Sequence, residues 1–108
     1  MAKHRTMTEV AGRIIRDADL SPSEKIVYLY IAAEYRAHYH NPVDCGSVSS
    51  VAADTNYSAS TVRRALRRLS ELELIKIVHR SPGWLNIELL HLDNGYSVLR
   101  QLASAGGA

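Results

Sequence analysis

The sequence predicts a mainly α fold with a small β-hairpin (α+β), in which a three-helix core is followed by the two strands of the hairpin. Three observations lead to this prediction. The segment Ser21-Pro22-Ser23-Glu24 combines a capping serine, a proline at the first helical position and a glutamate three residues after the cap. Residues 59–72 repeat apolar side chains at helical spacing, with arginines opposite them. The turn Arg80-Ser81-Pro82-Gly83 separates two strand-like runs.

The length of 108 residues fits a single domain with a modest core. The chain contains one cysteine, Cys45, so it cannot form an internal disulfide. No apolar run is long enough to span a bilayer, and the basic N-terminus is not followed by the apolar region of a signal peptide. We therefore expect a cytoplasmic protein with no membrane partner.

The formal net charge of +2 is distributed unevenly along the chain. Residues 1–16 carry a net +3, residues 17–56 a net −4, residues 57–84 a net +4, and residues 85–108 a net −1. A polyanion would therefore meet the two basic stretches.

The first two helices are predicted from their start signals. Thr6 and Glu9 stand at capping-box spacing, so we expect a short helix over residues 6–18, with an extended arm as the alternative because Gly12 weakens a helix. A long helix should run from Pro22 to about His38. Ile26, Leu29, Tyr30, Ala33 and Ala37 fall on one of its faces, and Val27, Tyr28, Ile31 and Tyr35 fall largely on the others. A helix that is apolar nearly all round is central in its fold, shared with a second subunit, or both.

The middle of the chain is predicted to be a loop followed by a short helix and a tight turn. Asn41-Pro42 and Cys45-Gly46 are turn signals, so residues 38–46 are expected to form a loop. A short helix should follow over residues 47–55. The turn Asn56-Tyr57-Ser58 then ends it, since asparagine tolerates the left-handed conformation and serine can cap the next helix.

The helix expected over residues 59–72 is the most informative segment. Its apolar side comprises Val62, Ala65, Leu66, Leu69 and Leu72, and its opposite side comprises Ser60, Arg63, Arg64 and Arg67. Thr61 and Arg68 lie at the edge of the apolar stripe, and we expect Arg68 to pack there or to pair with a carboxylate. The helix is therefore buried on one face and cationic on the other.

Two strands and a C-terminal segment complete the prediction. The strands are expected over residues 74–79 and 84–92, with Trp84 in the core of the hairpin rather than acting as a wedge in a DNA groove. Asp93-Asn94-Gly95 then turns the chain, and a short helix is expected over residues 96–103, before a frayed end.

This order of elements resembles the winged helix-turn-helix DNA-binding domains of bacterial, phage and plasmid regulators, and its opening is similar to that of the replication-initiator-like branch. The residues that carry the resemblance lie in Leu20–Lys25, Ser50–Thr55, Ser58–Leu69 and Leu72–Ile75. It covers about residues 20–92, and leaves residues 1–19 as a basic arm or short helix and residues 93–108 as a C-terminal helix or tail. The family usually has glycine where Glu73 stands, so the end of the helix and the angle of the wing are expected to differ.

The resemblance implies sequence-specific binding of double-stranded DNA, by a transcriptional regulator such as a repressor or by a replication or partition accessory factor. The helix over residues 59–72 would enter the major groove, and the wing over residues 76–84 would touch the backbone or the minor groove. The expected DNA-contacting residues are Ser58, Ser60, Thr61, Arg63, Arg64 and Arg67 in the helix, and Lys76, His79, Arg80 and Ser81 in the wing. Such a protein would be associated with the nucleoid.

A homodimer is also expected, because two-fold symmetry would present two such helices to a palindromic site. The broadly apolar helix over residues 22–38 and the segment over residues 96–103 are the candidate dimer surfaces. Two other functions remain open. One is a winged-helix adaptor that binds proteins in a replication or partition complex, and the other is RNA binding.

No catalytic or metal site is predicted. His38, His40, Asp44 and Cys45 resemble a loose metal set, but their spacing matches no zinc pattern, so we expect neither a metal nor a cofactor. Serine, histidine and aspartate residues occur without a motif that groups them, so we expect no enzyme activity. No binding site for a small-molecule ligand is evident.

Overall fold

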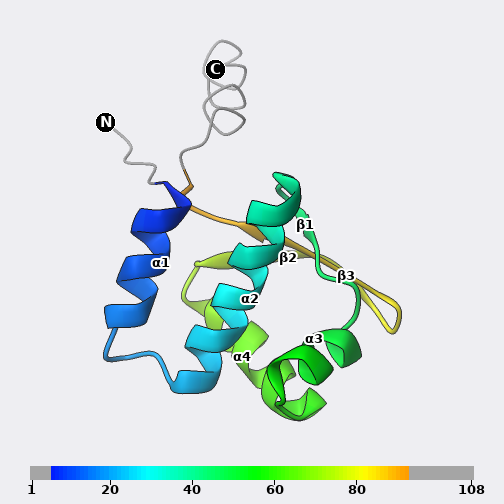
Figure 1. The fold of residues 1–108 in the computed structure, drawn as a ribbon. Coiled ribbons are helices and arrows are strands. Elements are labelled where there is room, and N and C mark those ends of the chain that lie inside the picture. The colour runs from blue at the N-terminus through cyan, green and yellow to red at the C-terminus, as the bar shows by residue number, and fades with distance from the viewer. Residues whose placement is uncertain (1–5, 93–108) are drawn as a thin grey trace.

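The computed structural model describes residues 6–92, so the turn, helix and frayed end expected within residues 93–108 lie outside the described residues. Over the described range, four helices pack with a small three-stranded antiparallel sheet (Figure 1). The helices are α1 (Met7–Arg16), α2 (Pro22–His38), α3 (Val48–Thr55) and α4 (Ala59–Glu71), and the strands are β1 (Val43–Asp44), β2 (Ile75–Ser81) and β3 (Trp84–Leu89). The predicted α+β fold is confirmed.

The helix starts are set by the caps that the sequence predicts. In α1 the backbone amide of Glu9 donates to the Thr6 hydroxyl, and the Glu9 carboxylate accepts from the Thr6 amide. The same reciprocal pair joins Ser21 and Glu24 at the start of α2, at 3.2 and 2.9 Å. Each pair satisfies two amides that would otherwise lack a partner in the first turn. Of the two alternatives for residues 6–18, the helix is therefore correct.

Helix α2 is the centre of the fold, as its broadly apolar surface predicts. It packs against α1, α3 and α4 and against strands β1 and β3, and Figure 1 shows it running between α1 and α3. Its buried side chains are Val27, Tyr28, Ile31, Ala32 and Tyr35. Ile26, Ala33 and Ala37 were predicted from the sequence to lie on a single face of this helix, and their side chains remain exposed. Most of the apolar surface of α2 is therefore used within the chain.

Strand β1 corrects the prediction that residues 38–46 form only a loop. Val43 pairs with Ile87 and Asp44 with Asn86, which makes β3 the central strand in the order β1-β3-β2. Two backbone hydrogen bonds of 2.8 Å continue the pairing, from the Cys45 amide to the Leu85 carbonyl and from the Leu85 amide to the Gly46 carbonyl. A strand of two residues carries no alternation pattern, and its partner lies some forty residues away, so local sequence signals did not reveal it.

Among the glycines within residues 6–92, Gly46 is the one in a left-handed conformation. Its φ of +76° lies in the left-handed region, and a Cβ atom there would come within 2.7 Å of the Ser50 hydroxyl. That hydroxyl accepts from the Ser47 amide in the cap of α3, at 2.8 Å. Gly46 therefore lets the chain pass from β1 into α3 without displacing the cap.

The hairpin differs from its predicted boundaries. β2 continues to Ser81, which pairs with Trp84, so Arg80 and Ser81 belong to the strand and only Pro82 and Gly83 form the loop. At the other end β3 stops at Leu89 instead of continuing to Leu92. The register between β2 and β3 shifts between Ile77 and His79, so Val78 is the extra residue of a bulge. The hairpin projects from the body of the molecule as a narrow arm (Figure 1).

One core assignment on the basic helix was wrong. Leu72, predicted on the buried side of the basic helix, is 39% exposed. The reason is that α4 ends at Glu71, so Leu72 leaves the helical geometry that would have pointed its side chain inward. The other four apolar residues expected on this side, Val62, Ala65, Leu66 and Leu69, are buried.

Candidate nucleic-acid interface

A tight turn joins α3 to α4 at the predicted residues. Asn56 ends α3 in the left-handed conformation, with φ +62°, and the amide of Tyr57 donates to the Ala52 carbonyl at 3.2 Å. Ser58 then caps α4, its hydroxyl accepting from the Thr61 amide at 3.1 Å. Because the turn contains only these residues, it fixes the angle between two helices that also pack against each other.

Helix α4 exposes a cationic face. Arg63, Arg64 and Arg67 are all exposed, as is Ser60 in the first turn, while the opposite side of the helix is buried against the rest of the core. Arg68 is also exposed, which corrects the expectation that it packs at the edge of the core. The buried stripe ends at Ala65 and Leu69 and does not reach this side chain. Four arginines therefore face solvent from a single helix of 13 residues.

The start of α4 places donors and hydroxyls close together. The Ser58 hydroxyl donates to the Thr61 hydroxyl at 2.9 Å, and the Arg64 guanidinium reaches back to the same Thr61 oxygen at 3.4 Å. These contacts draw Arg64 toward the N-terminal end of the helix. The first amides of a helix have no acceptor within it, so those of Ala59 and Ser60 are available to an anion, which the helix dipole also favours.

The hairpin distributes its predicted contact residues over both faces of the sheet. Leu85, Ile87 and Leu89 of β3 are buried, so their partners on β2 share the face toward the helices, and that face includes Arg80 opposite Leu85. The residues that share the outer face are Lys76, His79, Ser81, Trp84, Asn86 and Glu88. Lys76 lies opposite Glu88, which reduces the net positive charge at the base of the hairpin. The exposed cation nearest to the tip of the hairpin is therefore Arg80.

Trp84 is not in the core of the hairpin, contrary to the sequence prediction. Its side chain is 47% exposed and stacks on His79, with 4.0 Å between the ring centroids and 35° between the ring planes. The alternation of β3 explains this position, because Leu85 and Ile87 point inward and the residue before them must point outward. The same alternation in the sequence is the signal that would have identified Trp84 as a surface residue.

The junction between α4 and the hairpin holds Glu73 in the conformation that glycine usually provides. Glu73 has a φ of +58°. Its amide donates to the Ser70 carbonyl and the Leu74 amide donates to the Leu69 carbonyl, both at 3.0 Å, which is the pattern of a Schellman C-cap. The helix therefore ends in the cap that glycine commonly forms, so the difference expected at the end of the helix is not observed.

We expect Glu73→Gly to stabilise the protein by about 0.5–1 kcal/mol, because glycine adopts the left-handed conformation without the steric cost that a Cβ atom brings. Urea denaturation followed by circular dichroism measures the difference in the free energy of unfolding. The matched control is Glu71→Gly, which removes the same charge within the last turn of α4 and should destabilise by about 1 kcal/mol. A loss of stability in Glu73→Gly would show that its side chain, and not its backbone, holds this junction.

A hydrogen bond connects the helix-turn-helix unit to the central helix. The Tyr30 hydroxyl on α2 donates to the Asp54 carboxylate on α3 at 2.8 Å. Partial burial, together with this bond to a carboxylate, raises the pKa of Tyr30 above its ordinary range, so the hydroxyl stays protonated and remains a donor. The contact fixes α3, and through the turn it helps to fix the orientation of α4.

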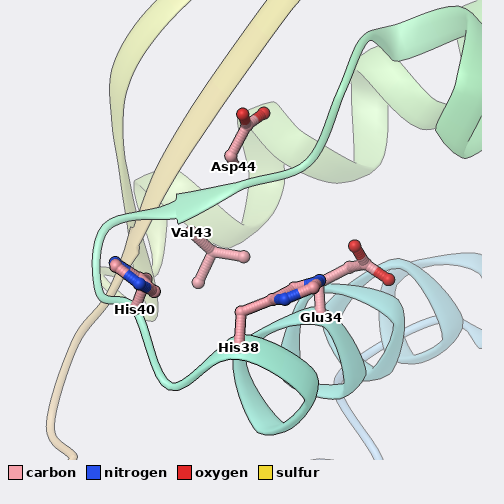
Figure 2. Close-up of a pocket in the computed structure, with 5 residues that line it drawn as sticks. All are labelled: Glu34, His38, His40, Val43 and Asp44. Atoms are coloured by element: carbon pink, nitrogen blue, oxygen red, sulfur yellow. The ribbon is translucent and has the colours of Figure 1, made fainter.

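A separate hollow of about 430 Å³ lies between the end of α2 and β1. It is lined by Glu34, His38, His40, Val43 and Asp44 (Figure 2). Figure 2 shows Val43 and Asp44 pointing to opposite sides of β1. Within residues 6–92 no three His, Cys, Asp or Glu side chains are grouped so that they could hold a metal ion. Burial raises the pKa of the nearby Cys45 thiol to about 12, so this residue is not a ready thiolate.

Comparison with known proteins gives one result. A family model described as a helix-turn-helix domain matches residues 18–75, which contain α2, β1, α3, α4 and the junction at Glu73. No curated protein and no solved structure matches the chain. None of the helices within residues 6–92 has the length and apolar character needed to cross a membrane.

Proposed function

Because this chain belongs to the helix-turn-helix domain family, we propose that it is a sequence-specific double-stranded DNA-binding protein. The observation that carries the proposal is the position of the four arginines, which are exposed on α4 directly after the turn while its opposite face is buried. Burial of that face fixes the rotation of the helix, so the cationic face must point to solvent. An exposed face of this charge attracts a polyanion.

In this proposal α4 enters the major groove, whose width accepts a helix. Arg63 and Arg67 are suited to reading guanine, because a guanidinium can donate two hydrogen bonds to the O6 and N7 atoms of that base. Arg64 and the hydroxyls of Ser58, Ser60 and Thr61 lie near the helix start, where they and the free amides would contact phosphate. The hydroxyls and Arg64 would then set the register, and the other two arginines would set the sequence preference.

The hairpin is proposed to act as the wing, which contacts the DNA backbone or the minor groove. Arg80 points to one face of the sheet, and Lys76, His79 and Ser81 point to the other. A DNA groove is bordered on each side by a sugar-phosphate backbone. If the hairpin enters a groove, residues on both faces of the hairpin would therefore contact DNA. Lys76 is the weakest of these candidates, because Glu88 lies opposite it.

The biological role that we propose is regulation of transcription, or an accessory function in replication or partition. A homodimer bound to a palindromic site remains part of this proposal. The α2 surface that a second subunit could cover is limited to the region of Ile26, Ala33 and Ala37, because the rest of the helix packs within the chain. The molar mass in solution, measured by light scattering with and without duplex DNA, tests the dimer.

The salt dependence of duplex binding tests the function. Of the exposed cations on α4 and the hairpin, the five proposed to contact phosphate or bases are Arg63, Arg64, Arg67, Lys76 and Arg80. If they act as proposed, the logarithm of the association constant should fall linearly with the logarithm of the salt concentration, with a slope of about −3 to −5. A duplex selected from random DNA should also give a footprint, and duplex RNA should not compete, because its major groove is too narrow for a helix. Binding to protein partners without any footprint would instead support the adaptor function.

A further inference from the structure

The hairpin carries an exposed aromatic pair, His79 and Trp84, and the contacts proposed so far do not use Trp84. Trp84 is 47% exposed, and Val78, the extra residue of the bulge in β2, is 48% exposed. Both are large apolar side chains on the hairpin that projects from the body of the molecule (Figure 1), and Arg80 lies on the same strand as Val78. No carboxylate lies between Val78 and Trp84 in the sequence. The tip therefore combines an apolar surface with a positive charge.

His79 holds the indole of Trp84 in place. The two rings lie on the outer face of the sheet, on adjacent strands, with 4.0 Å between their centroids. The imidazole lies against the indole, and about half of the Trp84 side chain remains exposed. A ring that is already oriented loses little conformational entropy when it makes a contact, so the pair is suited to binding.

From these observations we infer that Trp84 packs against the deoxyribose edge of duplex DNA, beside the groove that α4 occupies, and that His79 acts as a positioning residue in place of the direct wing contact proposed above. The inference rests on the proposed DNA-binding function. Base faces in a duplex are stacked and closed to a side chain, so the accessible apolar atoms of the backbone are those of the sugars. Arg80, on the other face of the tip, neutralises phosphate, so the tip matches both components of the backbone.

This contact differs from those of the arginines in its response to salt. An apolar contact releases no counterions, so its loss should weaken binding equally at every salt concentration. We expect Trp84→Ala to reduce the affinity for a selected duplex about tenfold, with an unchanged slope against salt, and Trp84→Phe to retain most of the affinity. The matched control is Tyr39→Ala, which removes an aromatic side chain that is also exposed but lies at the end of α2. This control should bind as the wild type does.

His79 is tested by rescue. His79→Ala should weaken duplex binding and should also make Trp84 more accessible to acrylamide in the free protein, because the ring that covers it is gone. His79→Phe restores a flat ring without restoring a hydrogen-bond donor, so it should restore both the affinity and the protection. Failure of His79→Phe to restore affinity would show that the imidazole binds DNA directly and is not a positioning residue.

Tryptophan fluorescence provides the decisive measurement, because Trp84 is the only tryptophan in the chain. Addition of the selected duplex should shift the emission of the wild-type protein and protect it from acrylamide. Duplex binding with unchanged emission and quenching overturns this inference and leaves the proposed function intact. A larger change in Trp84 emission with the matching single strand overturns it in favour of contact with an unpaired base. A change that follows protein concentration without DNA overturns it in favour of contact with a second copy of the chain. Absence of any duplex binding overturns both.

Discussion

Replacement of both Arg63 and Arg67 by alanine is expected to reduce the affinity for a selected duplex by about 100-fold or more. Both side chains are exposed on α4, four residues apart, so they lie on the same side of the helix one turn from each other. A bidentate contact from arginine to guanine contributes about 1–3 kcal/mol of discrimination, and tenfold in affinity corresponds to about 1.4 kcal/mol. Two such contacts therefore account for the expected loss. Titration of a labelled duplex by fluorescence anisotropy measures it.

The double variant should also lose specificity. Its residual binding should resemble binding to random DNA, because the remaining phosphate contacts carry no sequence information. The free energy of unfolding should change by less than about 0.5 kcal/mol, since both side chains are exposed and away from the core. A loss of binding can then be assigned to the interface and not to unfolding.

The control for charge is the double variant Arg13→Ala and Arg16→Ala on α1. These arginines are also exposed and their removal lowers the net charge equally, but α1 packs against α2 in the first basic stretch of the chain. We expect only a small, salt-sensitive loss of affinity from this change in the overall field. Equal losses in the two double variants would mean that net charge drives binding. Full affinity of the Arg63 and Arg67 variant would show that α4 is not the recognition helix.

The helical part of the fold could be predicted because its signals are local. Each cap joins residues three apart, as Thr6 with Glu9 and Ser21 with Glu24 do, and the turn at Asn56 depends on the conformational preference of a single residue. The exposed arginines follow from the same short-range periodicity. The candidate site was therefore largely visible in the sequence wherever it lies on α4.

The sheet was harder to predict because its partners are distant in the chain. Strand β1 exists only through pairing with β3, and neither Val43 nor Asp44 shows a pattern of its own. Trp84 was misplaced because its size favoured the core, whereas the alternation of β3 points it outward. In both cases the tertiary position of a strand outweighed the preference of a residue type.

Asn41 is the residue whose importance was least visible in the sequence, and its replacement by alanine is expected to destabilise the protein by about 2–4 kcal/mol. The Asn41 side chain is buried and its amide forms two hydrogen bonds with the backbone of Leu89, donating to its carbonyl at 2.9 Å and accepting from its N–H at 2.8 Å. Leu89 is 48 residues away and is buried itself, so alanine would leave two backbone groups without partners in the core. Each unsatisfied group costs about 1–3 kcal/mol. Urea denaturation measures the change as a shift of the unfolding midpoint.

Two further variants show whether these hydrogen bonds are the cause. Asn86→Ala changes the same residue type on the outer face of β3, where the side chain is half-buried, and should cost less than about 1 kcal/mol. Asn41→Asp keeps the acceptor for the Leu89 N–H but places a carboxylate against the Leu89 carbonyl, which should raise the pKa of the introduced carboxyl in the folded state. Protonation of the introduced carboxyl restores the missing donor. The stability deficit of this variant relative to wild type should therefore shrink as the pH falls toward about 4 and grow as the pH rises. A pH-independent loss in Asn41→Asp, or equal losses in Asn41→Ala and Asn86→Ala, would mean that the loop before β1 is held by something other than this pair of hydrogen bonds.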